Sequence, residues 1–278
     1  MKIFLSDMSK EIGKLSEVES FELKFKRYSI KEIEGMKFIV GEGKPTIREN
    51  MSFDKPDLLF SLINLVKGEL PRYFNEPHMD TVVSDEDILK WVEIHGIPYR
   101  DQTLNSKLGD EEWRPHILNL GKFKYKLAWL YSRFTLWKAI IDEDEEKIKK
   151  YKYAAQNSYK WIEMDNRYKN VDEMTKIKLA LAKETTLLTD ISVKLTYNIH
   201  SQRYEFQLLS NSLMDIANFQ LATLMTKERS DNKSHLKTCK MPGCNNVFWA
   251  DHGNQEFCSN PRCNKRNYWY HTHRKKKK

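Results

Sequence analysis

The sequence predicts a mainly α-helical α+β fold, with a small β-hairpin region near the N-terminus and a separate small module at the C-terminus. Three observations predict this class. Apolar residues recur every three or four positions through most of residues 115–230, as on one face of a helix. Apolar and charged residues alternate within residues 20–48, as in half-buried strands. All four cysteines lie within 25 positions near the C-terminus.

An N-terminal α+β region is predicted to cover residues 1–114. The segment "FELKFKRYSI" alternates apolar and charged residues from Phe21 onward, which predicts a strand. Glu34-Gly35 is a turn signal, and "MKFIV" after it is the predicted returning strand. Two short helices follow. The first is predicted between Pro56 and Gly68, and the second between a Ser84 cap and Gly96.

A helical body is predicted for residues 115–230. Three long apolar stripes step by three or four positions, which places each stripe on one helix face. They indicate long antiparallel helices that bury aromatic-rich faces, and this body is the candidate surface for a homodimer. The stripes consist of Phe123, Leu127, Leu130, Phe134, Trp137 and Ile141; of Ile148, Tyr151, Ala155, Tyr159 and Ile162; and of Met174, Ile177, Leu181, Thr185 and Leu188.

The helical pattern is interrupted by a predicted hairpin near residues 192–208. In "VKLTYNIHSQRYEFQL" the residues alternate on both sides of a polar centre at His200 to Gln202. Helical spacing then returns from Leu213 to Leu224. The following stretch, "TKERSDNKSH", has no apolar period and is interpreted as a linker.

Composition excludes several classes of protein. The 278 residues are 40% hydrophobic and 31% charged, which indicates a globular rather than a disordered chain. No uncharged apolar stretch approaches the length of a membrane-spanning helix, and the apolar run at the N-terminus is too short for a signal peptide. We therefore expect a cytoplasmic protein without membrane contact, whose cysteines stay reduced.

The cysteines form two pairs with the spacing of metal ligands. Four residues separate Cys239 from Cys244, four separate Cys258 from Cys263, and thirteen lie between the pairs. Zn²⁺ takes four thiolates at tetrahedral corners, and two short cysteine loops supply two corners each. The pattern predicts one structural zinc ion, held by these four residues in a finger that spans residues 231–278. Two disulfides or four unrelated thiols are the alternatives.

The residues around the pairs predict a treble-clef-like finger. The segment between the pairs fits a small hairpin that carries Phe248. Asn260 is a candidate helix cap and Pro261 a candidate first helical residue, so Cys263 is expected in the first turn of a helix. The metal would then fix the start of this helix.

The end of the chain carries the entire excess of positive charge. Residues 262–278 contain eight Lys or Arg and no acid, and the whole chain has 47 bases and 39 acids, so residues 1–261 are neutral. Bases interleaved with aromatic residues suit phosphate contact and base stacking, so DNA or RNA is the predicted partner. The candidate contacts are Arg262, Lys265, Arg266, Trp269, Arg274, Lys275, Lys276, Lys277 and Lys278.

Three alternatives for this tail remain open. Trp269 could cover the zinc core instead of stacking on a base. The run of lysines from Lys275 to Lys278 could be a solubilising end that touches phosphate only non-specifically. His271 or His273 could replace one cysteine as a metal ligand.

The segment "CKMPGCNNVFWADHGNQEFCSNPRCNKR" resembles the CGNR zinc finger, which is built as C-x4-C, a Phe-containing segment, aromatic-Cys-Ser, and x3-C with a basic helix. Asn264 and Lys265 stand where that family has Gly and Asn, so the tetrad is divergent. The resemblance covers the finger alone. It implies a transcription regulator or another nucleic-acid-binding protein, whose finger follows a helical domain called ABATE; residues 115–230 are compatible with such a domain. The matched positions are Phe248, Phe257, Cys258, Ser259, Cys263 and Arg266.

The sequence favours a nucleic-acid-binding regulator, of the bacterial transcription-regulator type, over an enzyme. It contains no G-x-S-x-G, H-E-x-x-H or G-x-G-x-x-G, and "GEGKPT" lacks the spacing of a phosphate-binding loop, so no catalytic residue is assigned. The alternative is an RNase, or a toxin-like or phage-defence effector, whose finger delivers the nucleic-acid substrate. A second alternative is a protein-interaction module. A polar cluster in a cleft of the body would favour the effector.

Overall fold

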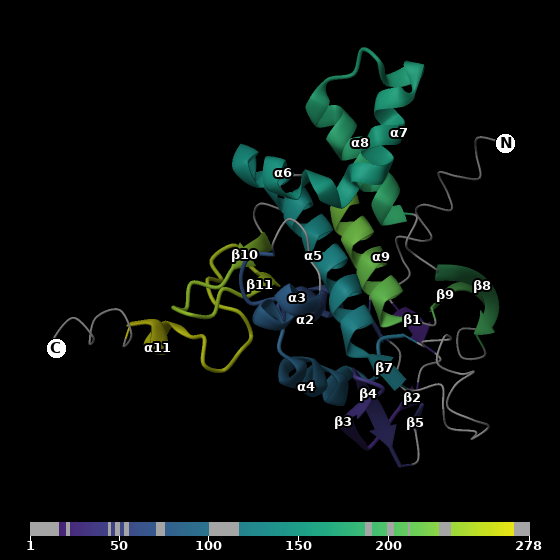
Figure 1. Cartoon of the computed structure of the whole chain (residues 1–278), viewed down its shortest axis with the longest axis vertical. Coiled ribbons are helices and arrows are strands. Elements are labelled where there is room, and N and C mark those ends of the chain that lie inside the picture. Colours follow the sequence, from purple (N-terminus) through teal and green to yellow (C-terminus); the bar gives the residue numbers. More distant parts are fainter. Residues whose placement is uncertain are drawn as a thin grey trace.

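The computed structural model describes residues 17–20, 23–43, 46–47, 51–52, 56–70, 76–99, 117–186, 191–198, 203–210, 212–227 and 235–269. It is mainly helical, with small sheets and a cysteine cluster near the C-terminus, so the predicted α+β class is confirmed. The long helices stand together in the middle of the molecule (Figure 1). The N-terminal strands lie at one end of these helices, and the cysteine-bearing segment lies on one side of them (Figure 1).

The predicted N-terminal hairpin is confirmed. Strands β3 (Arg27–Ile33) and β4 (Met36–Glu42) pair antiparallel, and β7 (Ile117–Asn119) extends the sheet in the order β3-β4-β7. Glu34 and Gly35 have φ of 51° and 75°, and two positive φ values form the tight turn whose twist matches paired strands.

The first predicted strand is broken near Phe25. The backbone N–H of Phe25 donates to the Tyr28 hydroxyl at 2.8 Å, so it is not available to a strand ladder. The residues before it form a separate short strand, β2 (Leu23–Lys24), which pairs with β5 (Thr46–Ile47). One continuous strand from position 21 is therefore wrong, because a local side-chain hydrogen bond competes with pairing.

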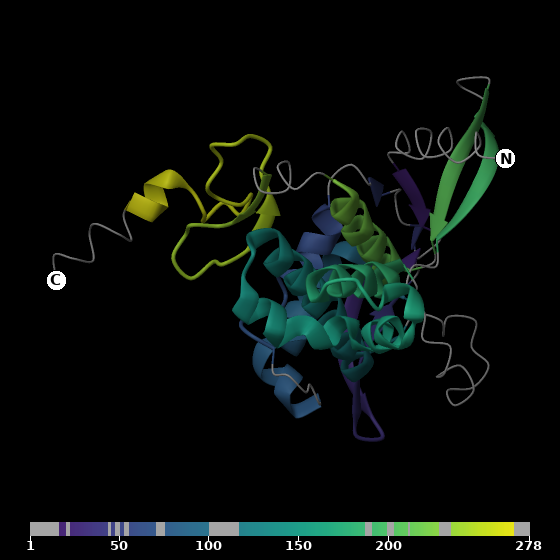
Figure 2. The same cartoon turned by 90° about the horizontal axis from the view of Figure 1, so that it is seen from above.

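The predicted second hairpin is also confirmed, and it belongs to a larger sheet. Strands β8 (Ile191–Asn198) and β9 (Arg203–Ser210) pair antiparallel, while the expected turn residues between them lie outside the described chain. β1 (Glu17–Ser20) runs parallel to β9, and β6 (Met51–Ser52) pairs with β1. In the view from above, this hairpin and the cysteine-bearing segment extend from opposite sides of the helices (Figure 2).

Three short helices follow the N-terminal strands: α2 (Asp57–Ile63), α3 (Glu76–Val82) and α4 (Asp85–His95). The limits of α4 match their local signals. The Ser84 hydroxyl accepts the N–H of Asp87 at 3.0 Å, and Gly96 ends the helix with φ of 83°. Capping residues were therefore sufficient to predict this helix.

The body is built on α5 (Leu120–Asp142), whose N-terminus is capped by the Asn119 side chain at 3.0 Å from the Lys122 N–H. Every apolar residue of the predicted first stripe is buried. Neither α5 nor any other helix in the described part of the chain combines the length and the apolar character that crossing a membrane requires. The remaining elements are α6 (Glu145–Tyr151), η2 (Lys152–Ala155), α7 (Gln156–Met164), η3 (Asn166–Tyr168), α8 (Glu173–Thr186) and α9 (Leu213–Thr226).

The second predicted helix is two helices joined by η2. Its stripe residues are all buried, so the predicted face is confirmed, but the tighter turn of η2 separates α6 from α7. The first turn of α7 is stabilised by a residue of α8, because the Glu184 carboxylate accepts the backbone N–H of Ser158 at 2.9 Å. The partner that fixes the break is thus 26 residues away.

Two hydrophobic clusters are present among the described residues. The large one joins buried residues from Phe25 to Leu236 and includes the strands, the short helices and the body. The small one surrounds the cysteines. The predicted boundaries at residues 114 and 230 stay predictions.

Candidate metal centre

The first cysteine pair lies in a short hairpin. β10 (Leu236–Thr238) pairs antiparallel with β11 (Val247–Trp249), and both cysteines of the pair lie in the connection. The Cys239 N–H donates to the Asn246 carbonyl at 2.8 Å, and Gly243 takes φ of 79° to turn the chain. The hairpin was expected between the two pairs, but it flanks the first pair instead.

Phe248 lies in β11 and is buried beside the cysteines, as the prediction of a hairpin carrying it requires. Its strand pairs with the residues before Cys239 and not with the residues before Cys258. In the register of this pair, Lys237 lies opposite Phe248. A segment that precedes the first cysteine thus supplies the partner strand, and the spacing of the cysteines alone carries no information about it.

The second pair spans a single turn that ends before the basic helix. The Asn260 side chain accepts the N–H of Arg262 at 3.0 Å, and the Cys263 N–H donates to the Asn260 carbonyl at 2.8 Å. The turn does not continue, because the Asn264 side chain donates to the Pro261 carbonyl at 3.0 Å and occupies the next helical acceptor. α11 (Lys265–Trp269) therefore begins two residues after Cys263, and the expectation that Cys263 lies inside the helix is wrong.

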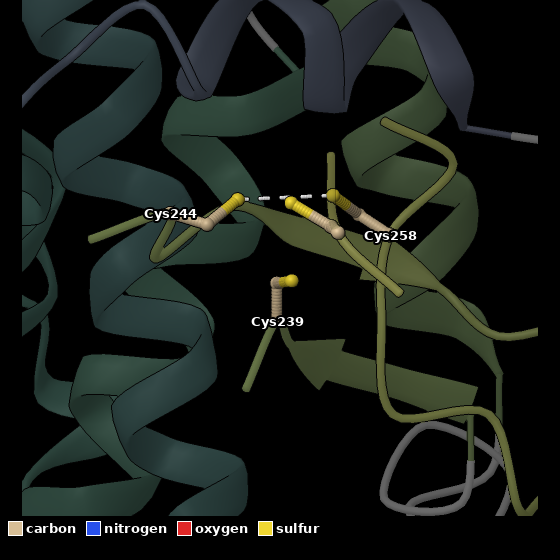
Figure 3. A group of neighbouring side chains, drawn as sticks. Cys239, Cys244 and Cys258 are labelled. Carbon is tan, nitrogen blue, oxygen red and sulfur yellow. Dashed lines mark hydrogen bonds between the residues drawn. The ribbon is translucent and has the colours of Figure 1, made fainter. Parts of the chain in front are cut away.

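The four cysteine sulfurs converge on one point. All four Sγ atoms lie within 4.8 Å of one another, and those of Cys244 and Cys258 are 3.8 Å apart (Figure 3). Four sulfurs at about 2.3 Å from a zinc ion would be about 3.8 Å from each other at tetrahedral corners. A disulfide needs about 2.05 Å, and all four thiols are free. The cluster could hold one metal ion.

The surroundings of the sulfurs favour a bound cation. Burial raises the pKa of the Cys258 and Cys263 thiols. Burial also acts on Cys239, but backbone N–H groups of Cys258 and Met241 donate to its sulfur, and its pKa lies below the usual value. One thiolate is therefore stabilised by the backbone, and a divalent cation would offset the burial cost of the others.

The predicted nucleic-acid contacts that fall within the described chain are on the surface. Arg262, Lys265 and Arg266 are exposed, and Trp269 is 59% exposed. α11 extends away from the body in both views (Figures 1 and 2). Arg274, His271, His273 and the lysines from Lys275 to Lys278 lie outside the described residues.

Two adjacent aromatic residues of α11 have different surroundings. Tyr268 is half-buried against the cysteine cluster, with its ring 5.6 Å from that of Phe257. Its neighbour Trp269 is the exposed one. Tyr268 thus covers the cysteine cluster, while Trp269 lies on the surface of α11.

The finger is docked on the body by residues that sequence reasoning missed. The side chain of Asn64, directly after α2, donates to the Val247 carbonyl and accepts the Val247 N–H, both at 2.9 Å. One amide thus pairs with the edge of β11 as a neighbouring strand would. No sequence signal marks Asn64, since its partner lies 183 residues away.

Further contacts tie Trp249 to both ends of the predicted linker. Lys227 Nζ lies 4.3 Å from the centre of the Trp249 ring, and the His235 ring stacks on it at 5.3 Å. His235 Nδ1 is also 2.7 Å from the Ala250 carbonyl oxygen. His235 ends the stretch interpreted as a linker and lies within the predicted finger, and these contacts tie it to β11 and the residue after β11.

We expect Asn64→Ala to loosen the finger without unfolding the body. The half-buried N–H and carbonyl of Val247 would both lose their partner, at a cost of about 1–3 kcal/mol. Hydrogen exchange at Val247 should accelerate roughly tenfold or more, because about 1.4 kcal/mol corresponds to a factor of ten. Asn157→Ala, at an exposed position of α7, is the matched control. Unchanged exchange in Asn64→Ala would mean that the amide does not hold the finger.

No family model, curated protein or solved structure matches the chain. Its fold and site define a helical α+β protein with a four-cysteine cluster that could hold one metal ion. The functional assignment therefore follows from the chemistry of this cluster and of the residues that it positions.

Proposed function

We propose that the chain is a zinc-finger protein that binds DNA or RNA through the basic segment after its cysteine cluster. We further propose that it is a transcription regulator whose finger is a divergent CGNR type. One observation carries the proposal: a four-cysteine cluster lies directly before exposed Arg262, Lys265 and Arg266. A metal held by the cluster would fix the turn that precedes α11 and so give these bases a defined position.

Zinc is the metal that this donor set fits best. Four thiolates select soft or borderline cations, and tetrahedral coordination by four cysteines is the usual form of a structural zinc site. The sulfur separations fit that geometry, and no coordination position is left for a water or a substrate. The metal would therefore act in folding and not in catalysis.

The charge distribution supports a polyanionic partner. Residues 262–278 carry eight bases without an acid, while residues 1–261 carry 39 of each. A neutral body with a basic end would meet phosphate through that end alone. Exposed Trp269 adds an aromatic face next to the bases, as single-stranded nucleic acid binders use.

The alternative of a nuclease effector requires a carboxylate ready for acid–base chemistry. A polar cleft of about 200 Å³ is lined by Asp80, Asp85 and Lys124, among others. Both carboxylates are ion-paired with Lys124, and Asp85 also pairs with Lys37 at 2.8 Å. This cleft is the kind of polar cluster that would favour the effector. Burial acts to raise the pKa of Asp85, but hydrogen bonds from Lys124 and Lys37 hold it below the usual value, so Asp85 is a poor general base near neutral pH, and this supports the regulator.

The test is the salt dependence of binding to a duplex DNA and to a single-stranded RNA. We expect the fourfold variant Arg262→Gln, Lys265→Gln, Arg266→Gln and Arg274→Gln to flatten the slope of log affinity against log salt by roughly 3 units, since each phosphate contributes about 0.9 on duplex DNA and about 0.7 on single strands. The nucleic acid that binds more tightly at the same salt concentration is the partner.

A matched control separates local contact from overall charge. Four exposed lysines of the remaining chain are replaced by Gln in this control, which should keep the wild-type slope. Equal slopes in the fourfold variant and the wild type, or no binding of either nucleic acid, would contradict the proposal and favour a protein-interaction module. The control positions are Lys31, Lys90, Lys149 and Lys160.

A further inference from the structure

The body contains a cavity of about 470 Å³ between α5, α8 and α9. Its inner wall is apolar and buried, with Trp137, Ile141 and Leu181 contributing large side chains. Ala182 and Ala222 also line it, and their small side chains leave the space open. Cavities of this size and lining bind small molecules.

The charged groups of the cavity are cationic. Lys178 and Lys227 are among the lining residues, and the described residues of the lining include no Asp or Glu. The Thr185 and Thr186 hydroxyls donate within α8, to the Leu181 and Ala182 carbonyls at 2.8 Å. The lysines are therefore the groups that could bind a charged part of a ligand.

We propose that this cavity binds a small amphipathic anion, a medium-chain carboxylate. Its apolar chain would lie against Trp137 and Leu181, and its carboxylate would pair with Lys178 and Lys227. Charge complementarity selects this class, because a cation would be repelled and a neutral apolar molecule would gain no charged contact with Lys178 or Lys227. The inference is independent of the proposed nucleic-acid binding.

The carboxylate end of the cavity adjoins the finger. Lys227 lines the cavity and also lies 4.3 Å over the Trp249 ring of β11. A bound carboxylate would therefore share Lys227 with a contact that docks the finger on the body. This position connects occupancy of the cavity with the seating of the finger.

The test uses the full chain and two probes, decanoate and the uncharged 1-decanol, in calorimetric titrations. We expect one decanoate per chain. The double variant Lys178→Gln and Lys227→Gln should weaken decanoate by about tenfold or more, since each lysine would make a charge-assisted hydrogen bond. It should leave 1-decanol unchanged. Lys160→Gln, exposed on α7, is the charge control.

Variants that fill the cavity test its location. Ala222→Trp should abolish binding of both probes, whereas Leu179→Trp, at a 38% exposed position of α8 outside the lining, should not. Ala182→Phe, at an exposed edge of the cavity, gives the same test if Ala222→Trp does not fold. The proposal is overturned if wild type binds no decanoate, if filled variants bind it normally, or if the lysine variant weakens both probes equally.

Discussion

Cys258→Ser is expected to unfold the finger and to abolish zinc binding, while the body stays folded. Structural zinc contributes on the order of 10 kcal/mol to the folding of its module, and three thiolates would retain little of that. The small cluster around the cysteines contains few other buried side chains, so its folding would depend mainly on the metal. The large cluster has its own buried residues and does not include the cysteines.

Metal analysis and hydrogen exchange measure this effect. Wild type should carry one zinc per chain, and the variant none. Exchange in residues 235–269 should approach that of an unfolded chain, with protection kept in α5 and α9. Ser259→Ala, at the exposed neighbouring position, should match wild type. Pure wild-type protein without zinc, and with four freely reactive thiols, would refute the metal site.

Lys124→Met is expected to destabilise the body by about 3 kcal/mol. Lys124 is 4% exposed on α5, and its ammonium pairs with Asp80 and, at 2.5 Å, with Asp85. Removing one partner of a buried ion pair leaves an uncompensated charge, which costs about 3–5 kcal/mol when burial is complete. The lower value applies because Asp85 keeps Lys37.

The same variant should change the response of the protein to acid. Burial acts to raise the pKa of Asp85, but hydrogen bonds from Lys124 and Lys37 outweigh it, and the pKa lies below the usual value. A carboxyl with a lowered folded-state pKa stabilises the fold above its usual pKa, and this contribution disappears as pH falls through the folded-state value. The loss of stability below about pH 4 should therefore be smaller in Lys124→Met than in wild type.

Urea unfolding between pH 7 and pH 3 measures both effects. Lys149→Met, at an exposed position of α6, is the control and should follow the wild-type curve at every pH. If Lys124→Met is as stable as wild type at pH 7, the ion pairs contribute nothing net. If its stability falls with pH as steeply as that of wild type, Asp85 does not gain its low pKa from Lys124.

Local signals in the sequence were sufficient to predict the helices and the cysteine cluster in which they occur. Ser84 and Gly96 predict the two ends of α4, because a cap acts within one helical turn. The spacing from Phe123 to Ile141 predicts the buried face of α5, because helical period alone decides which residues share a face. The cysteine spacing likewise predicts that four sulfurs can converge, since each pair lies on a short loop.

The tertiary structure decided the features whose partners lie far apart in the chain. β1 pairs with the distant strand β9, so that Val18 lies opposite Leu208. Asn64 pairs with Val247 from 183 residues away. The position of the cavity depends on three helices that only the complete core brings together. These contacts cannot be predicted from any one segment, because long-range pairing becomes stable only after the core has formed. The sequence by itself therefore determined the elements and the cysteine cluster, and the packed core decided where the finger docks and where the body is hollow.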